Sequence, residues 1–175
     1  WFGPAVQRST DLEHWEQVAE GPSWPDGTER ALNRIWFFHR DGDTLWLGVD
    51  DAGIFRSDDH GASWQPVVGL NEHPARHTWN AGGGGLCAHH MMTAGDRLWV
   101  GISAAGLLAS EDGGATWERR DGGIRSLAGP EDEPFEGACV HGVVADADNP
   151  DLIWRQDHSG VYRTEDGGRT WQVTE

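Results

Sequence analysis

Short apolar stretches alternate with Gly- and Asp-rich turns along the chain. One representative period contains four such stretches, at 86–92, 98–102, 107–110 and 116–119. Segments of this length, separated by turn-forming residues, predict β-strands joined by tight turns. No apolar run approaches the roughly 18 residues that a membrane-spanning helix requires. The pattern therefore predicts an all-β protein without a membrane span.

The pattern recurs about every fifty residues, which indicates a repeat architecture. Three segments align without gaps and end in tryptophan: 53–64, 106–117 and 160–171. A weaker copy occupies 8–15. A second tryptophan series, each member 17 or 18 positions before its partner, consists of Trp46, Trp99 and Trp154. Four strands in each period of this length are typical of a propeller blade.

We predict one β-propeller domain over 1–175 with three complete four-stranded blades, at about 29–67, 85–120 and 137–174. The segment 1–18 supplies only the last two strands of a further blade. Three and a half blades cannot close a ring, because propellers typically contain about four to eight. We therefore expect a ring of roughly six to eight blades, completed by missing blades or by a second chain.

The three aligned segments share the pattern Ser/Thr-x-Asp-x-Gly-x-Ser/Thr-Trp. The complete copies are Ser57, Asp59, Gly61, Ser63 and Trp64; Ser110, Asp112, Gly114, Thr116 and Trp117; and Thr164, Asp166, Gly168, Thr170 and Trp171. This pattern resembles the Asp box, or BNR repeat, of sialidase-superfamily propellers. The overall sequence, including the segment Gly-Leu-Asn-Glu-His-Pro at 69–74, is similar to bacterial exo-alpha-sialidase-like and YVTN/BNR-like repeat proteins.

Each Asp box has a structural interpretation. A short carboxylate or hydroxyl caps backbone N–H groups in a tight turn, the glycine adopts a positive φ, and the tryptophan covers the hairpin. Calcium or sugar binding by the aspartates is the alternative. Identical chemistry in every blade favours the structural role.

Antiparallel strands separate the two ends of each blade. In each blade, the turns between strands 1 and 2 and between strands 3 and 4 lie at one end, and the Asp boxes occupy that end. The turn between strands 2 and 3 is called the second turn. The second turns and the linkers 19–28, 68–84 and 121–136 gather at the opposite end, and long loops are where binding functions usually occur. The resemblance implies the same face, since sialidase-like propellers carry their sites away from the boxes.

Candidate substrate-binding residues at that end are Arg34, His77, Trp79, His89, His141 and His158. Aligning the inner strands puts Arg34, His89 and His141 at one equivalent position near the channel mouth, where they could bind an anionic group. Trp79, like Trp24, could stack on a sugar or cover a blade edge.

A transition-metal site is an alternative for the histidines. Neutral imidazoles of His89, His141 and His158, together with the Asp157 carboxylate, suit Zn, Ni or Cu. No sequence-local ligand motif supports this, so the preferred prediction contains neither a metal nor a cofactor. For any single histidine, bonding to backbone groups at a strand end is the simplest role.

Glycosidases generally need two carboxyl groups across the scissile bond. Asp50 and Asp157 are the candidate catalytic pair on this face, with Glu72 and the acidic run 131–133 also available. The resemblance to sialidases implies a tyrosine nucleophile, but the only tyrosine, Tyr162, aligns with core positions in the strand before an Asp box. The complete sialidase machinery is therefore absent from this segment.

The composition of the chain argues against some classes of binding partner. The 175 residues include 13 Arg, no Lys and 29 acidic residues, so the formal charge is 13 − 29 = −16. Such a surface repels phosphate backbones and anionic lipids, which argues against nucleic-acid or membrane-surface binding. Cys87 and Cys139 lie on adjacent inner strands, too far apart for a disulfide, and we expect buried free thiols. The chain starts at Trp1 without a signal pattern, so we interpret it as a piece of a longer protein and predict no compartment.

These patterns together predict a sialidase-like propeller that binds glycans or hydrolyses glycosidic bonds at the face opposite the Asp boxes. A non-catalytic scaffold that binds a protein partner is the first alternative. A His-rich metal-binding propeller is the second.

Overall fold

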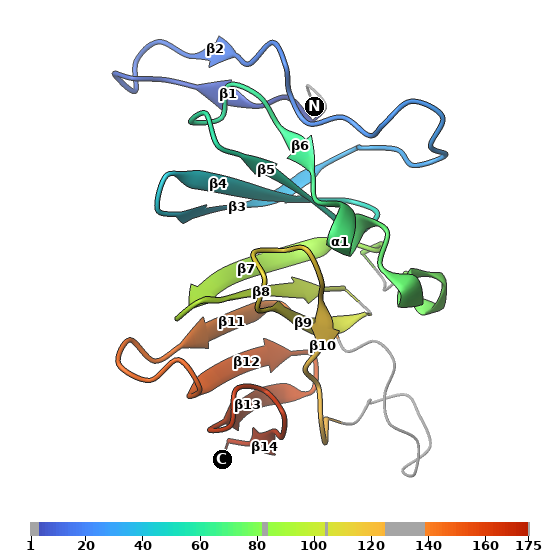
Figure 1. Cartoon of the computed structure of the whole chain (residues 1–175), viewed down its shortest axis with the longest axis vertical. Coiled ribbons are helices and arrows are strands. Elements are labelled where there is room, and N and C mark those ends of the chain that lie inside the picture. The colour runs from blue at the N-terminus through green and yellow to red at the C-terminus, as the bar shows by residue number, and fades with distance from the viewer. Residues whose placement is uncertain (1–3, 82–83, 104, 125–138, 175) are drawn as a thin grey trace.

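The computed structural model describes residues 4–81, 84–103, 105–124 and 139–174. Their strands form one two-stranded and three four-stranded antiparallel sheets, in chain order within each sheet (Figure 1). The small sheet pairs β1 (Gln7–Arg8) with β2 (Glu16–Gln17). The first full sheet contains β3 (Ile35–Asp41), β4 (Thr44–Val49), β5 (Gly53–Ser57) and β6 (Gln65–Pro66).

The other two full sheets repeat this order. The second contains β7 (Ala88–Ala94), β8 (Arg97–Ile102), β9 (Gly106–Ser110) and β10 (Glu118–Arg119). The third contains β11 (Gly142–Ala145), β12 (Ile153–Asp157), β13 (Gly160–Thr164) and β14 (Gln172–Val173). Two short helical segments, α1 (Val68–Asn71) and η1 (Pro74–Thr78), connect β6 to β7. The linker 68–84 is therefore partly helical.

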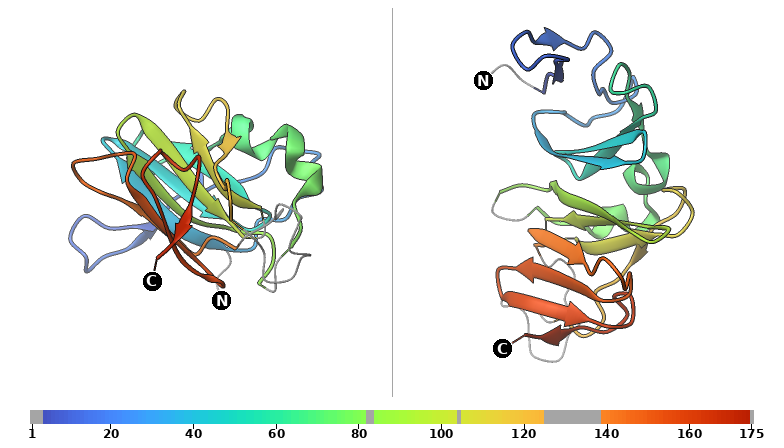
Figure 2. Two further views of the ribbon diagram at one scale, coloured as in Figure 1. Left: turned by 90° about the horizontal axis from the view of Figure 1, so that it is seen from below. Right: turned by 90° about the vertical axis from the view of Figure 1, so that its left-hand side faces the viewer.

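The sheets succeed one another like blades around an axis (Figure 2). The first strands of the full sheets are neighbours, since β3 contacts β7 and β7 contacts β11. Apolar side chains fill the space between successive sheets, for example Trp46 and Ile54 against Met91 in one cluster and Trp99 against Ile153 in the next. The prediction of an all-β propeller with three complete blades and part of another is confirmed.

Trp46 and Trp99, on the second strands of their blades, pack against a glycine of the following blade. A Cβ added to Gly114 would lie 3.5 Å from the Trp46 ring, and one added to Gly168 would lie 2.9 Å from the Trp99 ring. Both glycines have positive φ, so the turn needs glycine for its backbone as well as for the ring that covers it. Trp154, which follows in the same series, is only half-buried.

The three turns at 57–64, 110–117 and 164–171, called motif turns below, have the same hydrogen bonds. In the second, the Asp112 carboxylate accepts from Ser110 Oγ (2.8 Å), Thr116 N (2.8 Å) and Thr116 Oγ1 (2.6 Å), while Ser110 Oγ accepts from Gly114 N (2.8 Å). The first and third turns repeat this set. All the carboxylate oxygens of these aspartates are occupied by their own turns, as the structural interpretation requires.

We expect the hydrogen bonds of these turns to make the stability of the protein depend on pH in the acid range. The Thr116 hydroxyl and amide, followed by Ser110, lower the pKa of Asp112 to about 2. Equivalent hydrogen bonds hold the pKa values of Asp59 and Asp166 below their usual range. Because folding depresses these pKa values, the stabilisation is complete above about pH 4 and is lost as the pH falls towards 2 and below. Urea unfolding across this range measures it.

A matched variant isolates the effect in one turn. Thr116→Val removes the largest cause of the low Asp112 pKa, so the acid-dependent loss of stability should become smaller in that variant. Identical pH profiles of unfolding for Thr116→Val and the unmodified protein would contradict this account.

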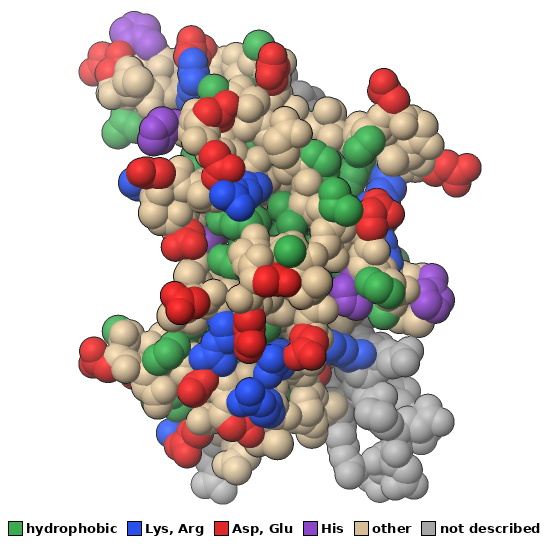
Figure 3. All heavy atoms as spheres, viewed as in Figure 1, with side chains coloured by type: hydrophobic (Ala, Val, Ile, Leu, Met, Phe, Trp, Pro, Cys, Tyr) green, Lys and Arg blue, Asp and Glu red, His purple; other side chains and the backbone are tan. Residues whose placement is uncertain are grey.

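The β3–β4 turn lies at the end of its blade opposite the linker that contains α1 and η1, as expected for a turn between the first two strands. In Figure 1 the β3–β4 hairpin points to the left, whereas α1 and η1 lie to the right. Acidic and basic side chains are interspersed over the lower blades (Figure 3), where Arg120 pairs with Glu111 and Glu118. Within the described ranges, no helix is long and apolar enough to cross a membrane.

Candidate functional site

The register of the inner strands corrects one predicted alignment. Asp50 N donates to Arg34 O, and Ser103 N donates to Cys87 O at the same place in the next blade. Arg34 is therefore equivalent to Cys87, two positions before His89. The residue equivalent to His89 is Trp36, because both lie at the register shifts that separate Ile35 from Phe37 and Ala88 from His90.

Trp36, His89 and His141 form a row of planar rings across the three inner strands. The Trp36 and His89 ring centroids are 4.9 Å apart, and the His89 and His141 rings stack at 5.3 Å with an interplanar angle of 19°. The Arg34 guanidinium lies 5.8 Å from the Trp36 ring at one end. We call Trp36, His89 and His141 the ring row.

His158 extends the row at the other end. It belongs to the turn between β12 and β13, and its Nε2 lies 3.1 Å from the Nε2 of His141. Burial, followed by the proximity of His141 and His158, lowers the pKa of His89. Burial and His158 also lower the pKa of His141, against the opposing effect of Asp157. His89 and His141 are therefore mainly neutral at pH 7. The structure brings together three of the predicted histidines.

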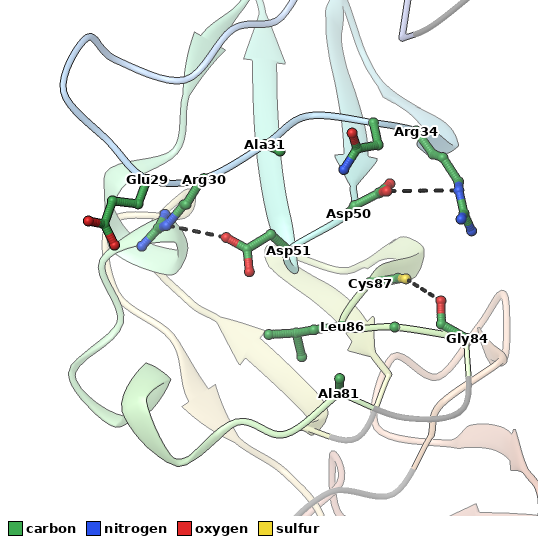
Figure 4. A pocket seen from close by; sticks show the side chains of 12 residues that line it. Glu29, Arg30, Ala31, Arg34, Asp50, Asp51, Ala81, Gly84, Leu86 and Cys87 are labelled. Carbon is green, nitrogen blue, oxygen red and sulfur yellow. Dashed lines mark hydrogen bonds and ion pairs between the residues drawn. The ribbon is translucent and has the colours of Figure 1, made fainter. Parts of the chain in front are cut away.

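A cleft of about 620 Å³ adjoins the Arg34 end of the row (Figure 4). Its polar lining consists of Glu29, Arg30, Asn33, Arg34, Asp50 and Asp51. Leu86 and Cys87 of the next blade contribute to the opposite wall. The cleft thus lies between two blades, on the face away from the motif turns. It places carboxylates and guanidinium groups around one space.

Asp50 is the carboxylate most enclosed by this cleft. Its backbone bridges to Cys87 of the next blade, which positions the side chain between the two inner strands. Its Oδ2 lies 3.9 Å from Arg34 Nε, whereas the buried Oδ1 has no hydrogen-bond partner among the described residues. A buried, unsatisfied acceptor is costly, so this atom is suited to accept a hydrogen bond from a bound molecule.

Asp51, by contrast, belongs to an ion-pair cluster at the cleft edge. Its Oδ2 lies 3.5 Å from Arg30 Nε and 3.3 Å from Arg76 Nη2. Arg30 also pairs with Glu72, whose Oε1 lies 3.4 Å from Nη1. Glu29 lines the same cleft and makes no ion pair in the described part of the chain. Asp51 is therefore the better anchored of these acids, and Glu29 the freer.

The other predicted catalytic residue, Asp157, is engaged internally. Its carboxylate accepts from Arg155 Nη2 at 3.0 Å and from Ser159 N at 2.7 Å, and its side chain is almost completely buried. This geometry favours a positioning role for Asp157, since it fixes the turn that carries His158. Asp157 does not line the cleft that contains Asp50.

Two further predicted residues lie outside both the ring row and the cleft. Trp79 stacks on His73 at 5.4 Å, lies under the Arg76 guanidinium at 5.2 Å, and packs against the core. His77 is exposed and contacts the carbonyl of Pro74. Trp24 packs on Phe55, so both tryptophans cover blade edges. The acidic run 131–133 lies outside the described residues.

Both cysteines are free thiols, as expected, but their environments differ. Cys87 is buried, and burial, followed by Asp50, raises the pKa of its thiol to about 11. Cys139 is only partly buried, which corrects the expectation for that residue. The Cys139 Sγ lies 3.1 Å from Ser103 Oγ and within 4.8 Å of a ring nitrogen of His141.

No family model matches the chain. Among curated proteins, it is 26% identical over 160 residues to the oligoxyloglucan-reducing end-specific xyloglucanase of Emericella nidulans, a match that covers 90% of this chain and 17% of that protein. The chain spans about a fifth of the length of the curated xyloglucanases that it matches.

Solved structures agree on the fold. The chain superposes on an ancestral GH74 enzyme with a TM-score of 0.57 and 17% identity, covering 97% of this chain and 22% of that one. It superposes on YCF48 from Cyanidioschyzon merolae with a TM-score of 0.53 and 25% identity, covering 85% and 41% of the two chains. The chain is thus a part of a β-propeller that is similar to glycoside hydrolases.

Proposed function

We propose that the face formed by the ring row and the cleft binds a glycan chain, as part of a glycoside-hydrolase-like propeller. One observation carries the proposal: a polar cleft between two blades continues into a row of stacked planar rings. Carbohydrate ligands suit this arrangement, because sugar rings pack on exposed aromatic surface such as that of Trp36, and their hydroxyls bond to carboxylates and guanidinium groups. The xyloglucanase relatives favour xyloglucan as the glycan.

Hydrolysis would require two carboxyl groups of this cleft. We assign Asp50 as one, because its Oδ1 is buried beside Arg34 and has no partner in the described residues. Glu29 is the second, since Asp51 is held by two arginines. The sialidase-like interpretation of the motif turns leads to a different ligand, an acidic sugar whose carboxylate would bind Arg34.

Binding of xyloglucan oligosaccharides, measured by calorimetry on the purified protein, tests the proposal. Trp36→Ala should weaken binding about threefold to tenfold through the lost stacking surface. Trp15→Ala is the matched control, because Trp15 is an exposed tryptophan of the incomplete blade. Equal affinities for Trp36→Ala and the unmodified protein would contradict the assignment of the ring row.

Release of reducing sugar tests the catalytic half separately. Asp50→Asn should lower the rate by about a hundredfold or more, which is typical of removing a general acid or base. A sialylated oligosaccharide in parallel distinguishes the acidic-sugar ligand. Binding without release of reducing sugar would support a glycan-binding propeller and contradict the assignment of hydrolase activity. Binding of neither sugar would favour the protein-binding scaffold.

A further inference from the structure

A thiol and two imidazoles meet where the segment just before β11 approaches the start of the β12–β13 turn. The Cys139 Sγ and one ring nitrogen from each of His141 and His158 all lie within 4.8 Å of one another. Within this set the two Nε2 atoms are already 3.1 Å apart. These residues come from two separate chain segments, so sequence spacing does not bring them together.

The separations are close to those of a metal's ligand shell. Zn–N bonds of about 2.0–2.1 Å and Zn–S bonds of about 2.3 Å at tetrahedral angles place ligand atoms roughly 3.3–3.6 Å apart. The two Nε2 atoms are nearly at this spacing, and the thiol needs a shift of at most about 1.4 Å from the 4.8 Å limit. Thiolate and imidazole are the donors that zinc and similar ions prefer over oxygen ligands.

Each donor rests on a well-supported part of the fold. Val140, between Cys139 and His141, is fully buried, and a Cβ on Gly101 would lie 2.8 Å from it. His141 N donates to Gln156 O at 2.9 Å, which ties β11 to β12. The turn that carries His158 is fixed by Asp157, itself bonded to buried Arg155. Because these contacts already hold the three donors close together, metal binding would require little rearrangement of the fold.

We propose that Cys139, His141 and His158 form a binding site for a divalent transition-metal ion of the zinc type. The three protein donors leave a fourth tetrahedral position open to water. On binding, Cys139 Sγ forms a bond to the metal and releases its proton to solvent, while the two imidazoles donate neutral nitrogen lone pairs. His89 stacks on His141 as a neighbour and is not one of the three donors. Asp157, a ligand in the sequence-based alternative, is replaced here by Cys139.

Titration of the reduced, metal-free protein with Co²⁺ provides a direct test. A cobalt–thiolate bond gives a ligand-to-metal charge-transfer absorption in the near ultraviolet, so we expect this band to saturate at one Co²⁺ per chain and to disappear when Zn²⁺ is added. Cys139→Ser should abolish the band. His141→Ala and His158→Ala should each weaken Co²⁺ binding by about tenfold or more.

Two matched controls separate the site from other thiols and histidines. Cys87→Ser removes the other cysteine, which bonds to the Gly84 carbonyl, and should leave the band unchanged. His60→Asn removes an exposed imidazole from a motif turn at a φ of 56°, a conformation that asparagine tolerates, and should also bind Co²⁺ normally. Circular dichroism of every variant checks that the fold is retained.

The outcomes decide the proposal whether or not the protein binds glycans. Absence of the charge-transfer band in the folded, reduced protein would overturn it, as would a band that survives Cys139→Ser. A band lost in Cys87→Ser but kept in Cys139→Ser would overturn it by moving the thiolate to the other cysteine.

Discussion

Arg155→Ala is expected to lower the free energy of unfolding by about 3–5 kcal/mol, the usual cost of removing one partner from a buried ion pair. The Arg155 side chain has no exposed surface, and it pairs with Asp121 and with Asp157, whose side chains are also buried. Its guanidinium also lies 5.9 Å from the Tyr162 ring. Alanine would leave two carboxylates in the interior without this cation. Urea unfolding measures the change.

Arg163→Ala is the matched control for this prediction. Arg163 lies on β13, the next strand of the same blade, and pairs with Glu165 of the following motif turn, but both side chains are substantially exposed. An exposed pair contributes only about 0–1 kcal/mol, so this variant should unfold close to the unmodified protein. Similar losses in the two variants would show that burial of the Arg155 cluster is not what makes it important.

Arg155 also shows how far the sequence could predict the interior. Its place on β12 is equivalent to Leu47 and Val100, both fully buried, as the strand pairing shows. A charged residue in an otherwise apolar column of the repeat is a detectable signal. Its partner Asp121 could not be identified in the same way, because Asp121 reaches it from a linker after another blade.

The fold itself was predictable because each blade reuses the same spacing. Tryptophans and turn residues recur at nearly constant intervals, and the structure has the corresponding sheets in chain order. Strand pairing between neighbours in sequence needs no long-range information. This is why the number of complete blades and the separate ends of each blade followed from the sequence.

The alignment of the candidate site was predicted less well than the fold, since it depends on the placement of a single position. Subtracting 53 residues, the spacing between Trp46 and Trp99, from position 89 gives Trp36 as the equivalent of His89. The alignment of the inner strands by sequence instead pairs His89 with Arg34. Register shifts on β3 and β7 place Trp36 and His89 at the same point. The ring row therefore begins with an aromatic residue, and Arg34 contacts it from the cleft.

Trp99→Ala is expected to lower the free energy of unfolding by about 3–5 kcal/mol, as is typical for a fully buried tryptophan. Trp99 has no exposed surface and lies against Gly168 of the next blade, so alanine would open a cavity between two sheets. Trp154, the next member of the same series, is only half-buried. Trp154→Ala should cost less, because part of its ring already contacts water.

The comparison between these two tryptophans tests the role of packing between blades. Both lie on the second strand of a blade, but the described chain places a motif turn against Trp99 and none against Trp154. Val161 of the last blade is likewise 43% exposed, whereas its equivalents Ile54 and Leu107 are fully buried. Equal losses from the two substitutions would mean that packing within a blade dominates. A larger loss for Trp99→Ala would assign the difference to the neighbouring blade, measured by urea unfolding of both variants under one set of conditions.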